Sequence, residues 1–348
     1  NGKIAQIGDL QPREGEEIRS AAGLYVLPGL VDIHIHAYAG ADCMRGEDDV
    51  RRMSEGLLKT GVAAFMPTTM SAPIEATNRA LRAIQAVRDM PCEKGAAVLG
   101  AHMEAPFLCE KYKGAQLGEC LMNPSVEAYE AMTRGTDCVR MMTLAPELPG
   151  ALDMVAYLKA RGVVTCAAHS NATAEEVHAA ADRGLTQITH LFNAQSPLHH
   201  RKPGVPGAGL ADERIIVQAI ADGLHLHPDA LRIAALCKGA KGMALISDSM
   251  EAAGMPDGQY DLGGQAVFVQ NGEARLADGV IAGSTLVLHR AIHNMITLAK
   301  MPPETVIPMA TSTPADSVGA KGYGRIEPGA CGVLTLMDAG WNLAGVTA

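Results

Sequence analysis

Eight short apolar runs, alternating with segments of helical length, constrain the fold of this chain more than any other feature. The runs lie near Tyr25–His34, Ala63–Thr68, Ala97–Glu104, Val139–Ala145, Val163–His169, Gln187–Phe192, Ile215–Ala221 and Met243–Asp248. Amphipathic segments between them fit helices near Glu47–Lys59, Pro73–Asp89, Ser125–Thr133, Ala151–Ala160, Thr173–Arg183 and Pro228–Lys238. Strands that alternate with helices form parallel sheets, and eight such units can close into a barrel. The sequence therefore predicts an α/β fold, a (β/α)8 TIM-type barrel, with a doubly wound sheet as the alternative.

Three parts of the chain do not fit the barrel pattern. Residues 1–25 are polar and rich in turns, and residues 323–348 alternate in the manner of β-strands. Within residues 258–283, strand-like runs are separated by turn pairs such as Asn271-Gly272, which are typical of hairpins. We predict a barrel over residues 26–322 that carries this β insertion, and a small β domain built from the two chain ends.

Charge and cysteine content narrow the range of partners. The 348-residue chain has a net charge of −9, with no block of like charges and no basic stripe, so nucleic acid and anionic membranes are poor partners. Its eight cysteines are scattered and form no CxxC pair, which is typical of reduced, intracellular proteins. We see no signal peptide and no apolar run long enough to span a bilayer. These features indicate a cytoplasmic protein.

Residues that can bind a metal or transfer a proton stand at the ends of six of the eight runs. In a barrel, the carboxyl ends of the strands line the active site. These ends carry His34, His36, Glu104, His169, His190, His225 and Asp248. Side chains two apart on a strand face the same way, so His34 and His36 can reach one ion. A lone histidine at a strand end is most often structural, but the joint pattern predicts a metal site at the barrel mouth.

The stretch Gln187–Gly207 combines a metal-binding group with an anion-binding group. His190 stands where a strand gives way to a loop, and Arg201 follows a few residues later. A planar guanidinium suits a phosphate or carboxylate because it donates two parallel hydrogen bonds. The pattern indicates a substrate with a reactive group at one end and an anionic group at the other.

A series of motifs spans nearly the whole chain. In order they are PGLVDIHIH, HMEAPF, AAHSNAT, THLFNAQSPLHHRKPG, IADGLH, SDSMEAAGMPDGQY and AGSTL. Together they resemble the family of N-acetylglucosamine-6-phosphate deacetylases within the amidohydrolase superfamily. The PGxxDxHxH pattern marks only the superfamily, whereas the THLFNA and IADGLH segments are far more specific. The resemblance implies a barrel with a small β-sandwich domain; against the family pattern both chain ends look shortened.

The resemblance also implies a divalent-metal site. The principal ligands would be Glu104, His169 and His190, and a second ion could lie at His34 and His36, bridged by Glu104. One or two ions per subunit are expected, with Zn first and Fe, Mn or Co as alternatives, because nitrogen and oxygen ligands suit all four. Asp248 matches the family's catalytic acid and base.

The resemblance further implies a set of substrate contacts. These are Ala115, Gln116, Asn193, Ala194, Arg201, His225, Ile281, Ala282 and Gly283. Arg201 matches a phosphate-binding arginine that reaches across a homodimer into the neighbouring site. Gln116 stands where the family often has a histidine; an amide can donate a hydrogen bond there but cannot become a cation.

The reaction implied is hydrolysis of the N-acetyl group of N-acetylglucosamine 6-phosphate, giving glucosamine 6-phosphate and acetate. Alternatives are another N-acetyl amino-sugar phosphate, such as N-acetylgalactosamine 6-phosphate, or a different amidohydrolase reaction. Many cyclic-amide hydrolases place a carbamylated lysine on the fourth strand, but that run here, VRMMTLAPE, has no lysine. A non-catalytic sugar-phosphate sensor is a further alternative, which the intact Asp248 and principal ligands disfavour.

Overall fold

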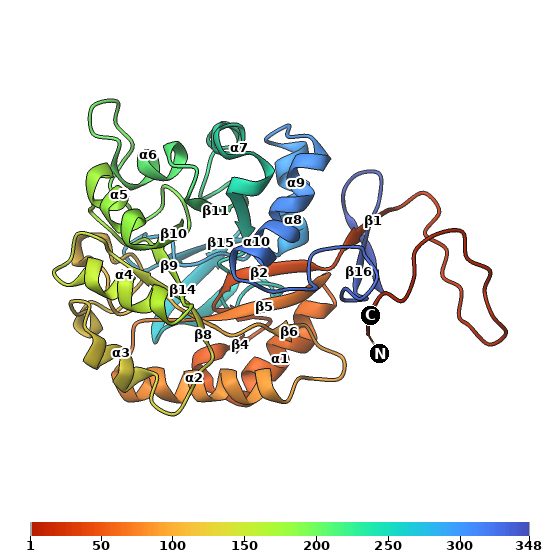
Figure 1. Cartoon of the computed structure of the whole chain (residues 1–348), viewed down its shortest axis with the longest axis horizontal. Coiled ribbons are helices and arrows are strands. Elements are labelled where there is room, and N and C mark those ends of the chain that lie inside the picture. The colour runs from red at the N-terminus through yellow and green to blue at the C-terminus, as the bar shows by residue number, and fades with distance from the viewer. Residues whose placement is uncertain (1, 348) are drawn as a thin grey trace.

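The computed structural model describes residues 2–347, and its centre is a parallel barrel surrounded by helices (Figure 1). The barrel strands are β2 (Leu30–Ile35), β5 (Val62–Thr69), β7 (Ala101–Met103), β8 (Val139–Leu144), β9 (Val164–Ala167), β10 (Leu185–Ile188), β11 (Ile216–Ile220) and β12 (Met243–Ile246). Neighbours in this order pair in parallel, and β6 (Ala97–Val98) also pairs with β5. The barrel closes at its mouth, where the Asp248 amide donates to the His34 carbonyl at 2.9 Å and the His36 amide donates to the Ser249 carbonyl at 3.0 Å. The predicted barrel is confirmed.

The helices follow the strands in sequence and cover the outside of the barrel. They are α1 (Glu47–Leu58), α2 (Ile74–Asp89), α3 (Val126–Met132), α4 (Ala151–Ala160), α5 (Ala174–Arg183), α6 (Gly204–Ala211), α7 (Pro228–Gly242), α8 (Leu288–Thr297), α9 (Pro303–Met309) and α10 (Ser312–Ser317). Helix α5 begins with a capping box, in which Thr173 and Glu176 each bond the other's backbone amide. None of the helices within residues 2–347 has the length and apolar character needed to cross a membrane.

The barrel strands are buried on both faces, which explains their continuous apolar character. Every residue of β5 and of β2 is buried, because helices cover one face and the barrel interior covers the other. The interior also contains buried polar groups, including Gln187, Thr189 and Gln218. Such groups are costly to bury unless they are hydrogen-bonded.

The predicted first strand, Tyr25–His34, is in fact two strands. β1 (Tyr25–Pro28) pairs antiparallel with β16 (Leu334–Met337), which pairs with β17 (Leu343–Thr347), whereas β2 belongs to the barrel. The break falls at Gly29, where a Cβ would lie 2.4 Å from the Cβ of Ala63. Only glycine allows this close approach where the chain passes from the small sheet into the barrel.

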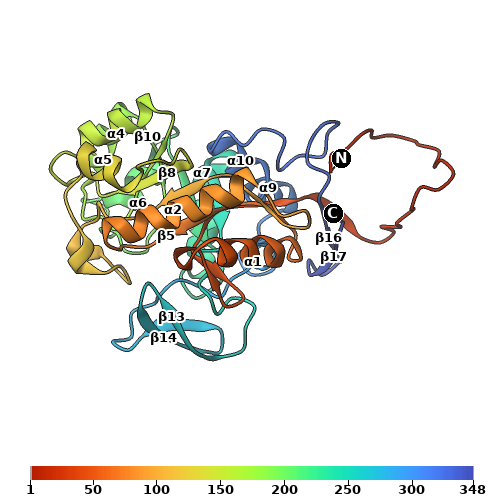
Figure 2. The same ribbon diagram turned by 90° about the horizontal axis from the view of Figure 1, so that it is seen from below.

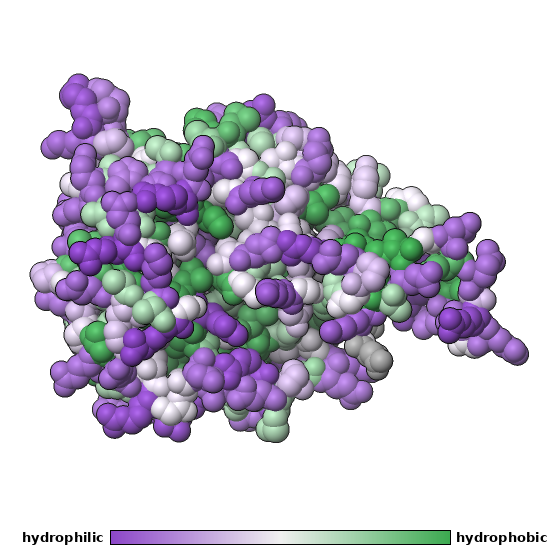
Figure 3. Space-filling model, in the orientation of Figure 1, coloured by the Kyte–Doolittle hydropathy of each residue, from purple (hydrophilic) through white to green (hydrophobic). Residues whose placement is uncertain are grey.

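The two ends of the described chain lie side by side at this small sheet (Figures 1 and 2). The Ile4 amide donates to the Ala330 carbonyl at 2.9 Å. Figure 3 shows a mostly hydrophilic surface, with an apolar area where β1 and β16 lie in Figure 1. Tyr25 and Val26 of β1 are 49% and 41% exposed. The small sheet therefore has one open face, unlike the barrel strands.

A second antiparallel sheet is inserted between β12 and α8. It consists of β13 (Gly258–Leu262), β14 (Gln265–Gln270) and β15 (Glu273–Leu276) and projects from one side of the barrel (Figure 2). Asn271 and Gly272 have φ of 53° and 76°, as a two-residue hairpin turn requires. The sheet packs its apolar side against Met70 and Met250, which follow β5 and β12. This contact places the insertion beside the barrel mouth.

Candidate active site

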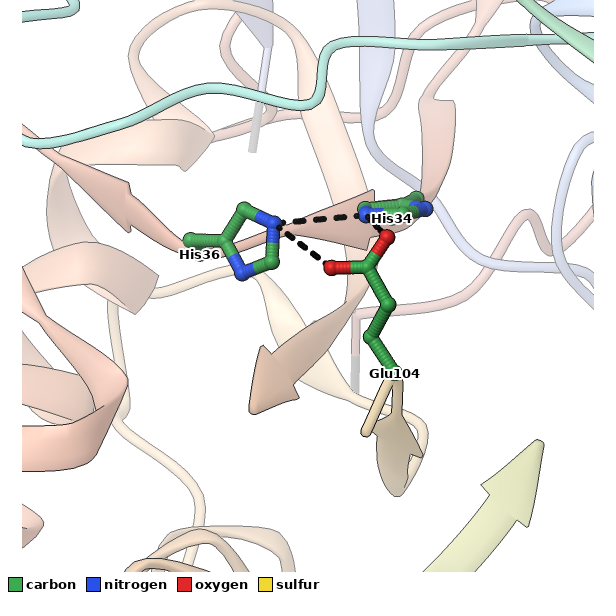
Figure 4. A group of neighbouring side chains, drawn as sticks. All are labelled: His34, His36 and Glu104. Atoms are coloured by element: carbon green, nitrogen blue, oxygen red, sulfur yellow. Dashed lines mark hydrogen bonds and ion pairs between the residues drawn. The ribbon is translucent and has the colours of Figure 1, made fainter. Parts of the chain in front are cut away.

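Glu104 lies at the centre of a cluster of four histidines at the barrel mouth. Its Oε1 atom is 3.0 Å from Nε2 of His190 and 3.2 Å from Nε2 of His169, which follow β10 and β9. Its Oε2 atom is 3.3 Å from Nε2 of His36, and Oε1 is 3.4 Å from Nε2 of His34 (Figure 4). Glu104 is thus shared by two sets of side chains that could each hold a metal ion, one with His169 and His190 and one with His34 and His36.

The donor atoms of this cluster fit a divalent ion. All five side chains are buried, and each histidine bonds outward through Nδ1, which leaves Nε2 directed at Glu104. Histidine nitrogen and carboxylate oxygen are common ligands of zinc and related ions. Metal-binding histidines usually donate their other ring proton to a carbonyl or carboxylate, as His36, His169 and His190 do. The structure brings the predicted ligands together in the arrangement that a metal site needs.

The carboxylates of the cluster are held in the ionised form. Burial alone would raise the pKa of Glu104, but the charge of His34 and the hydrogen bonds from His169 and His190 hold this pKa well below its usual range. Burial would also raise the pKa of Asp248, and His34 and His36 likewise hold it well below its usual range. Both groups can therefore accept a metal or a proton at neutral pH.

Asp248 lies beside the cluster, two residues beyond β12. Its Oδ1 atom is 3.1 Å from Nε2 of His36 and 3.3 Å from Nε2 of His34, and the residue is 8% exposed. Its carboxylate also lines the cavity described below. The side chain can therefore reach both the cluster and a molecule bound in the cavity.

Three residues that carry the proposed metal and proton-transfer groups have left-handed backbones. His169, His190 and Asp248 have φ of 46°, 32° and 51°, which is uncommon for residues other than glycine. Each stands just after a barrel strand, at the point where the chain turns out of the sheet. Strained conformations of this kind cluster at functional sites.

A cavity of about 560 Å³ opens above the cluster, which is within the usual range for small-molecule sites. The predicted substrate contacts that line it are Ala115, Gln116, Asn193, Ala194, His225, Ile281 and Gly283. Ala282 does not line it: the residue is fully buried, and its amide donates to the Ala274 carbonyl at 3.1 Å. Ala282 therefore fixes the segment whose neighbours face the cavity.

Arg201 lies outside the cavity of its own subunit. It is exposed, and its Nη1 atom lies 2.7 Å from Nε2 of His200. The cavity lining contains neither residue. Within one chain, the structure does not bring Arg201 to the other predicted site residues.

Gln116 bonds to Glu104 as well as facing the cavity. Its amide nitrogen donates to Glu104 Oε2 at 2.8 Å, and its amide oxygen accepts from the Ser71 backbone at 2.7 Å. The Ser71 bond fixes which end of the amide faces the carboxylate. Gln116 therefore orients Glu104.

His225 forms a tight pair with Asp222. Its Nδ1 atom is 2.6 Å from Asp222 Oδ2, and Asp222 Oδ1 accepts the backbone amides of Leu224 and His225. Burial lowers the pKa of His225, but the hydrogen bond and charge of Asp222 outweigh it, so the net pKa is raised. His225 thus presents an imidazolium to the cavity more readily than a free histidine would.

Sequence reasoning missed the loop that carries Lys111, Tyr112 and Lys113, all of which line the cavity. The Lys111 ammonium donates to Asn171 Oδ1 at 3.1 Å, and the Tyr112 carbonyl accepts from His169 Nδ1 at 2.9 Å. The sequence signal that could have identified this loop is the run Lys111-Tyr112-Lys113, which stands directly before Gly114-Ala115-Gln116. These lysines add positive charge to the walls of the cavity.

The fold and the site together define a class of protein: barrel enzymes that hold divalent ions at the carboxyl ends of their strands. Comparison with known proteins narrows the class. The profile of the Amidohydrolase family matches residues 25–345. The chain belongs to the amidohydrolase family.

Individual relatives are similar over almost the whole chain. N-acetylglucosamine-6-phosphate deacetylase of Vibrio furnissii is 36% identical and aligns with 99% of this chain and 86% of its own length. N-acetylgalactosamine-6-phosphate deacetylase of Escherichia coli O157:H7 is 37% identical over 91% of this chain and 84% of its own. A mutant N-acetyl-D-glucosamine-6-phosphate deacetylase of Mycobacterium smegmatis, solved in complex with N-acetyl-D-glucosamine-6-phosphate, is 29% identical, with a TM-score of 0.91 and coverage of 99% and 91%.

Proposed function

We propose that this chain hydrolyses the N-acetyl group of N-acetylglucosamine 6-phosphate to give glucosamine 6-phosphate and acetate. One observation carries the proposal: a single cavity is lined both by the buried groups Glu104, His169 and Asp248 and by the cationic groups Lys111 and Lys113. The first set suits hydrolysis of an amide, and the second suits a phosphate. The names of the relatives describe the same reaction.

The residues divide the chemistry between them. Glu104, His169 and His190 would hold a divalent ion, which when bound would supply Lewis acidity to lower the pKa of a water molecule and to polarise the acetyl carbonyl. Asp248 accepts a proton from the water that adds to the carbonyl carbon, and it returns a proton to the nitrogen as the C–N bond breaks. Gln116 keeps Glu104 oriented throughout.

The decisive test is a panel assay. Acetate release should be measured with N-acetylglucosamine 6-phosphate, N-acetylgalactosamine 6-phosphate and unphosphorylated N-acetylglucosamine. We expect the highest kcat/KM with the first compound and a large loss without the phosphate. Absence of acetate release from every compound, in protein that carries metal, would contradict the proposal.

The galactosamine epimer is the second candidate substrate. The relative in Escherichia coli O157:H7 named for that substrate is as similar to this chain as the glucosamine-type relatives are. The two substrates differ only in the orientation of one hydroxyl, and a site built to hydrogen-bond that hydroxyl discriminates strongly. A higher kcat/KM for N-acetylgalactosamine 6-phosphate would select this alternative.

We propose zinc as the first choice of metal, with one or two ions per subunit. The shared carboxylate of Glu104 and the intact pair His34 and His36 support a second ion. Metal analysis of the assayed sample tests both points. Fe, Mn or Co in place of zinc would change the metal but not the proposed roles of the ligands.

We further propose that the chain acts as a homodimer in which Arg201 completes the neighbouring site. The exposed position of Arg201, outside its own cavity, supports this role. Mixed dimers of Arg201→Ala and Asp248→Asn subunits should recover activity, because one of their two sites keeps both residues. Failure of recovery in verified mixed dimers would contradict the shared site.

We also propose a cytoplasmic location for the protein. All eight cysteines are free in the structure, as expected in a reducing compartment. Detection of the protein in cell fractions tests the assignment, and recovery outside the cytoplasmic fraction would contradict it.

A further inference from the structure

The four histidines of the cluster differ in what accepts their outward ring proton. Nδ1 of His36, His169 and His190 lies 2.9 to 3.0 Å from a backbone carbonyl, that of Thr68, Tyr112 and Asn193 in turn. A carbonyl can only accept, so these three rings must carry their proton on Nδ1. In the neutral ring, Nε2 is then left with a free lone pair.

His34 is held differently. Its Nδ1 atom lies 2.7 Å from the hydroxyl oxygen of Thr189. A hydroxyl can donate or accept, so this contact alone does not decide which nitrogen of His34 carries the proton. If Thr189 donated to Nδ1, a neutral His34 would carry its proton on Nε2, which faces Glu104 and Asp248, and could not bind a metal there.

A chain of buried amides removes this ambiguity. The Thr189 hydroxyl donates to Gln218 Oε1 at 2.5 Å, and Gln218 Nε2 donates to Gln187 Oε1 at 2.7 Å. Gln187 Nε2 in turn donates to the Ser317 carbonyl at 3.3 Å. The last acceptor is a backbone oxygen, so reversing the chain would set two acceptors against each other at Ser317.

We propose that Gln218, oriented by Gln187, is a positioning residue that holds His34 in the tautomer with a bare Nε2. The inference rests on the proposed metal site and adds to it the residues that prepare one ligand. The hydroxyl of Thr189 is used as a donor toward Gln218, so its oxygen must accept from His34. Gln187 and Gln218 lie on the neighbouring strands β10 and β11, and Thr189 directly follows β10. All three are fully buried, which leaves them no water to replace these bonds.

Burying Gln187 and Gln218 within the barrel costs folding free energy, and the positioning role explains why glutamines stand there. An apolar side chain would pack there without any need for hydrogen bonds, and a buried amide destabilises a fold unless it is fully bonded. Here each side-chain amide donates its hydrogen bond away from His34, and the series ends at the Ser317 carbonyl. Removing a residue that orients a metal ligand in this way commonly weakens metal binding about 10- to 100-fold.

The test compares Gln218→Met with the wild type as full-length protein, with the His34 tautomer recorded before zinc is added and the affinity taken from a zinc titration. Methionine keeps the approximate shape and removes the acceptor, so Thr189 becomes free to donate to His34. Ring ¹⁵N spectra of labelled histidine report which nitrogen carries the proton, and the His34 signals are assigned by their loss in His34→Gln. We expect the proton on Nδ1 in the wild type and on Nε2 in Gln218→Met, with zinc affinity at the His34 site lowered about 10- to 100-fold.

Two further comparisons keep the test sharp if Gln218→Met folds poorly. Thr189→Ser retains the hydroxyl and should keep the wild-type tautomer and zinc affinity, whereas Thr189→Val should lose affinity. Thr165→Val is the packing control, because the Thr165 hydroxyl is buried without a hydrogen-bond partner among the described residues. Thr165→Val should leave the His34 tautomer and the zinc affinity unchanged.

A wild-type His34 with its proton on Nε2 would overturn the inference. So would a folded Gln218→Met protein with an unchanged tautomer and unchanged zinc affinity. The His34 tautomer and the zinc affinity are both measured without any turnover of substrate. A protein with the expected tautomer but no deacetylase activity would therefore contradict the proposed reaction and not this inference.

Discussion

Replacing Asp248 by asparagine isolates the proton transfer from the rest of the site. Asparagine keeps the shape of the side chain but cannot accept a proton. Asp248 lies 3.1 Å from His36 and 3.3 Å from His34, and it takes no part in the group formed by Glu104, His169 and His190. The fold and the metal held by that group should therefore remain.

The expected loss of turnover follows from the role of a positioned acid and base. Such a group contributes about 10²- to 10⁴-fold, so kcat should fall at least ~10²-fold, or about 2.7 kcal/mol in the activation free energy. Acetate release should be measured at saturating substrate, with metal content and thermal unfolding checked on the same sample. Mass spectrometry excludes deamidation back to aspartate.

A matched control shows whether the substitution type itself is harmful. Asp49→Asn changes another buried carboxylate, which lies on α1 and accepts from the Asp42 amide at 3.0 Å, outside the cavity. This variant should keep its turnover. Near wild-type kcat in Asp248→Asn would refute the proposed mechanism even with the family assignment intact.

Three other perturbations test separate parts of the molecule. Arg201→Ala should raise KM strongly for the phosphorylated sugar and little for the unphosphorylated one; equal losses on both would mean that its role is wrong. Asp222→Asn removes the partner that raises the pKa of His225, with Asp248 and Glu273 as the other nearby acids, so KM for the phosphorylated sugar should begin to rise at a lower pH than in the wild type. A KM–pH profile identical to the wild type would exclude that coupling. Phe65→Ala should lower the free energy of unfolding, measured in urea, by about 3–5 kcal/mol, because Phe65 is fully buried on β5. A loss of stability below about 1 kcal/mol would mean that the surrounding core closes around the gap.

The barrel was predictable because its strands are buried on both faces. The run predicted at Ala63–Thr68 became β5, Val62–Thr69, since a doubly covered strand is a continuous apolar run with sharp ends. The break between β1 and β2 was not predicted, because the sequence carries no sign of it. Apolar character continues across Gly29, and only the close approach to Ala63 in three dimensions reveals the change of sheet.

The side chains on the strands were easier to place than those on the loops. His34 and His36 share a face because strand residues alternate, which is a local property. Lys111 and Lys113 line the cavity only because the loop after β7 folds over the mouth, which depends on the whole barrel. In the sequence they are ordinary charged loop residues, and the position of the run KYK directly before GAQ is the local feature that sets them apart from solvated ones.

The left-handed backbones of His169, His190 and Asp248 could not be predicted either, because a positive φ is uncommon for any residue other than glycine, even though His and Asp adopt it more often than most. Each such conformation costs about 1–3 kcal/mol and persists only where surrounding contacts enforce it. Those contacts are visible: Tyr112 and Asn193 hold the rings of His169 and His190, and the His34 carbonyl accepts the Asp248 amide. Glycine would relieve the strain at each position, so stability alone would favour it there. That the chain instead carries two imidazoles and a carboxylate at these positions indicates that their side chains, and not the turns, are what the barrel mouth is built to present.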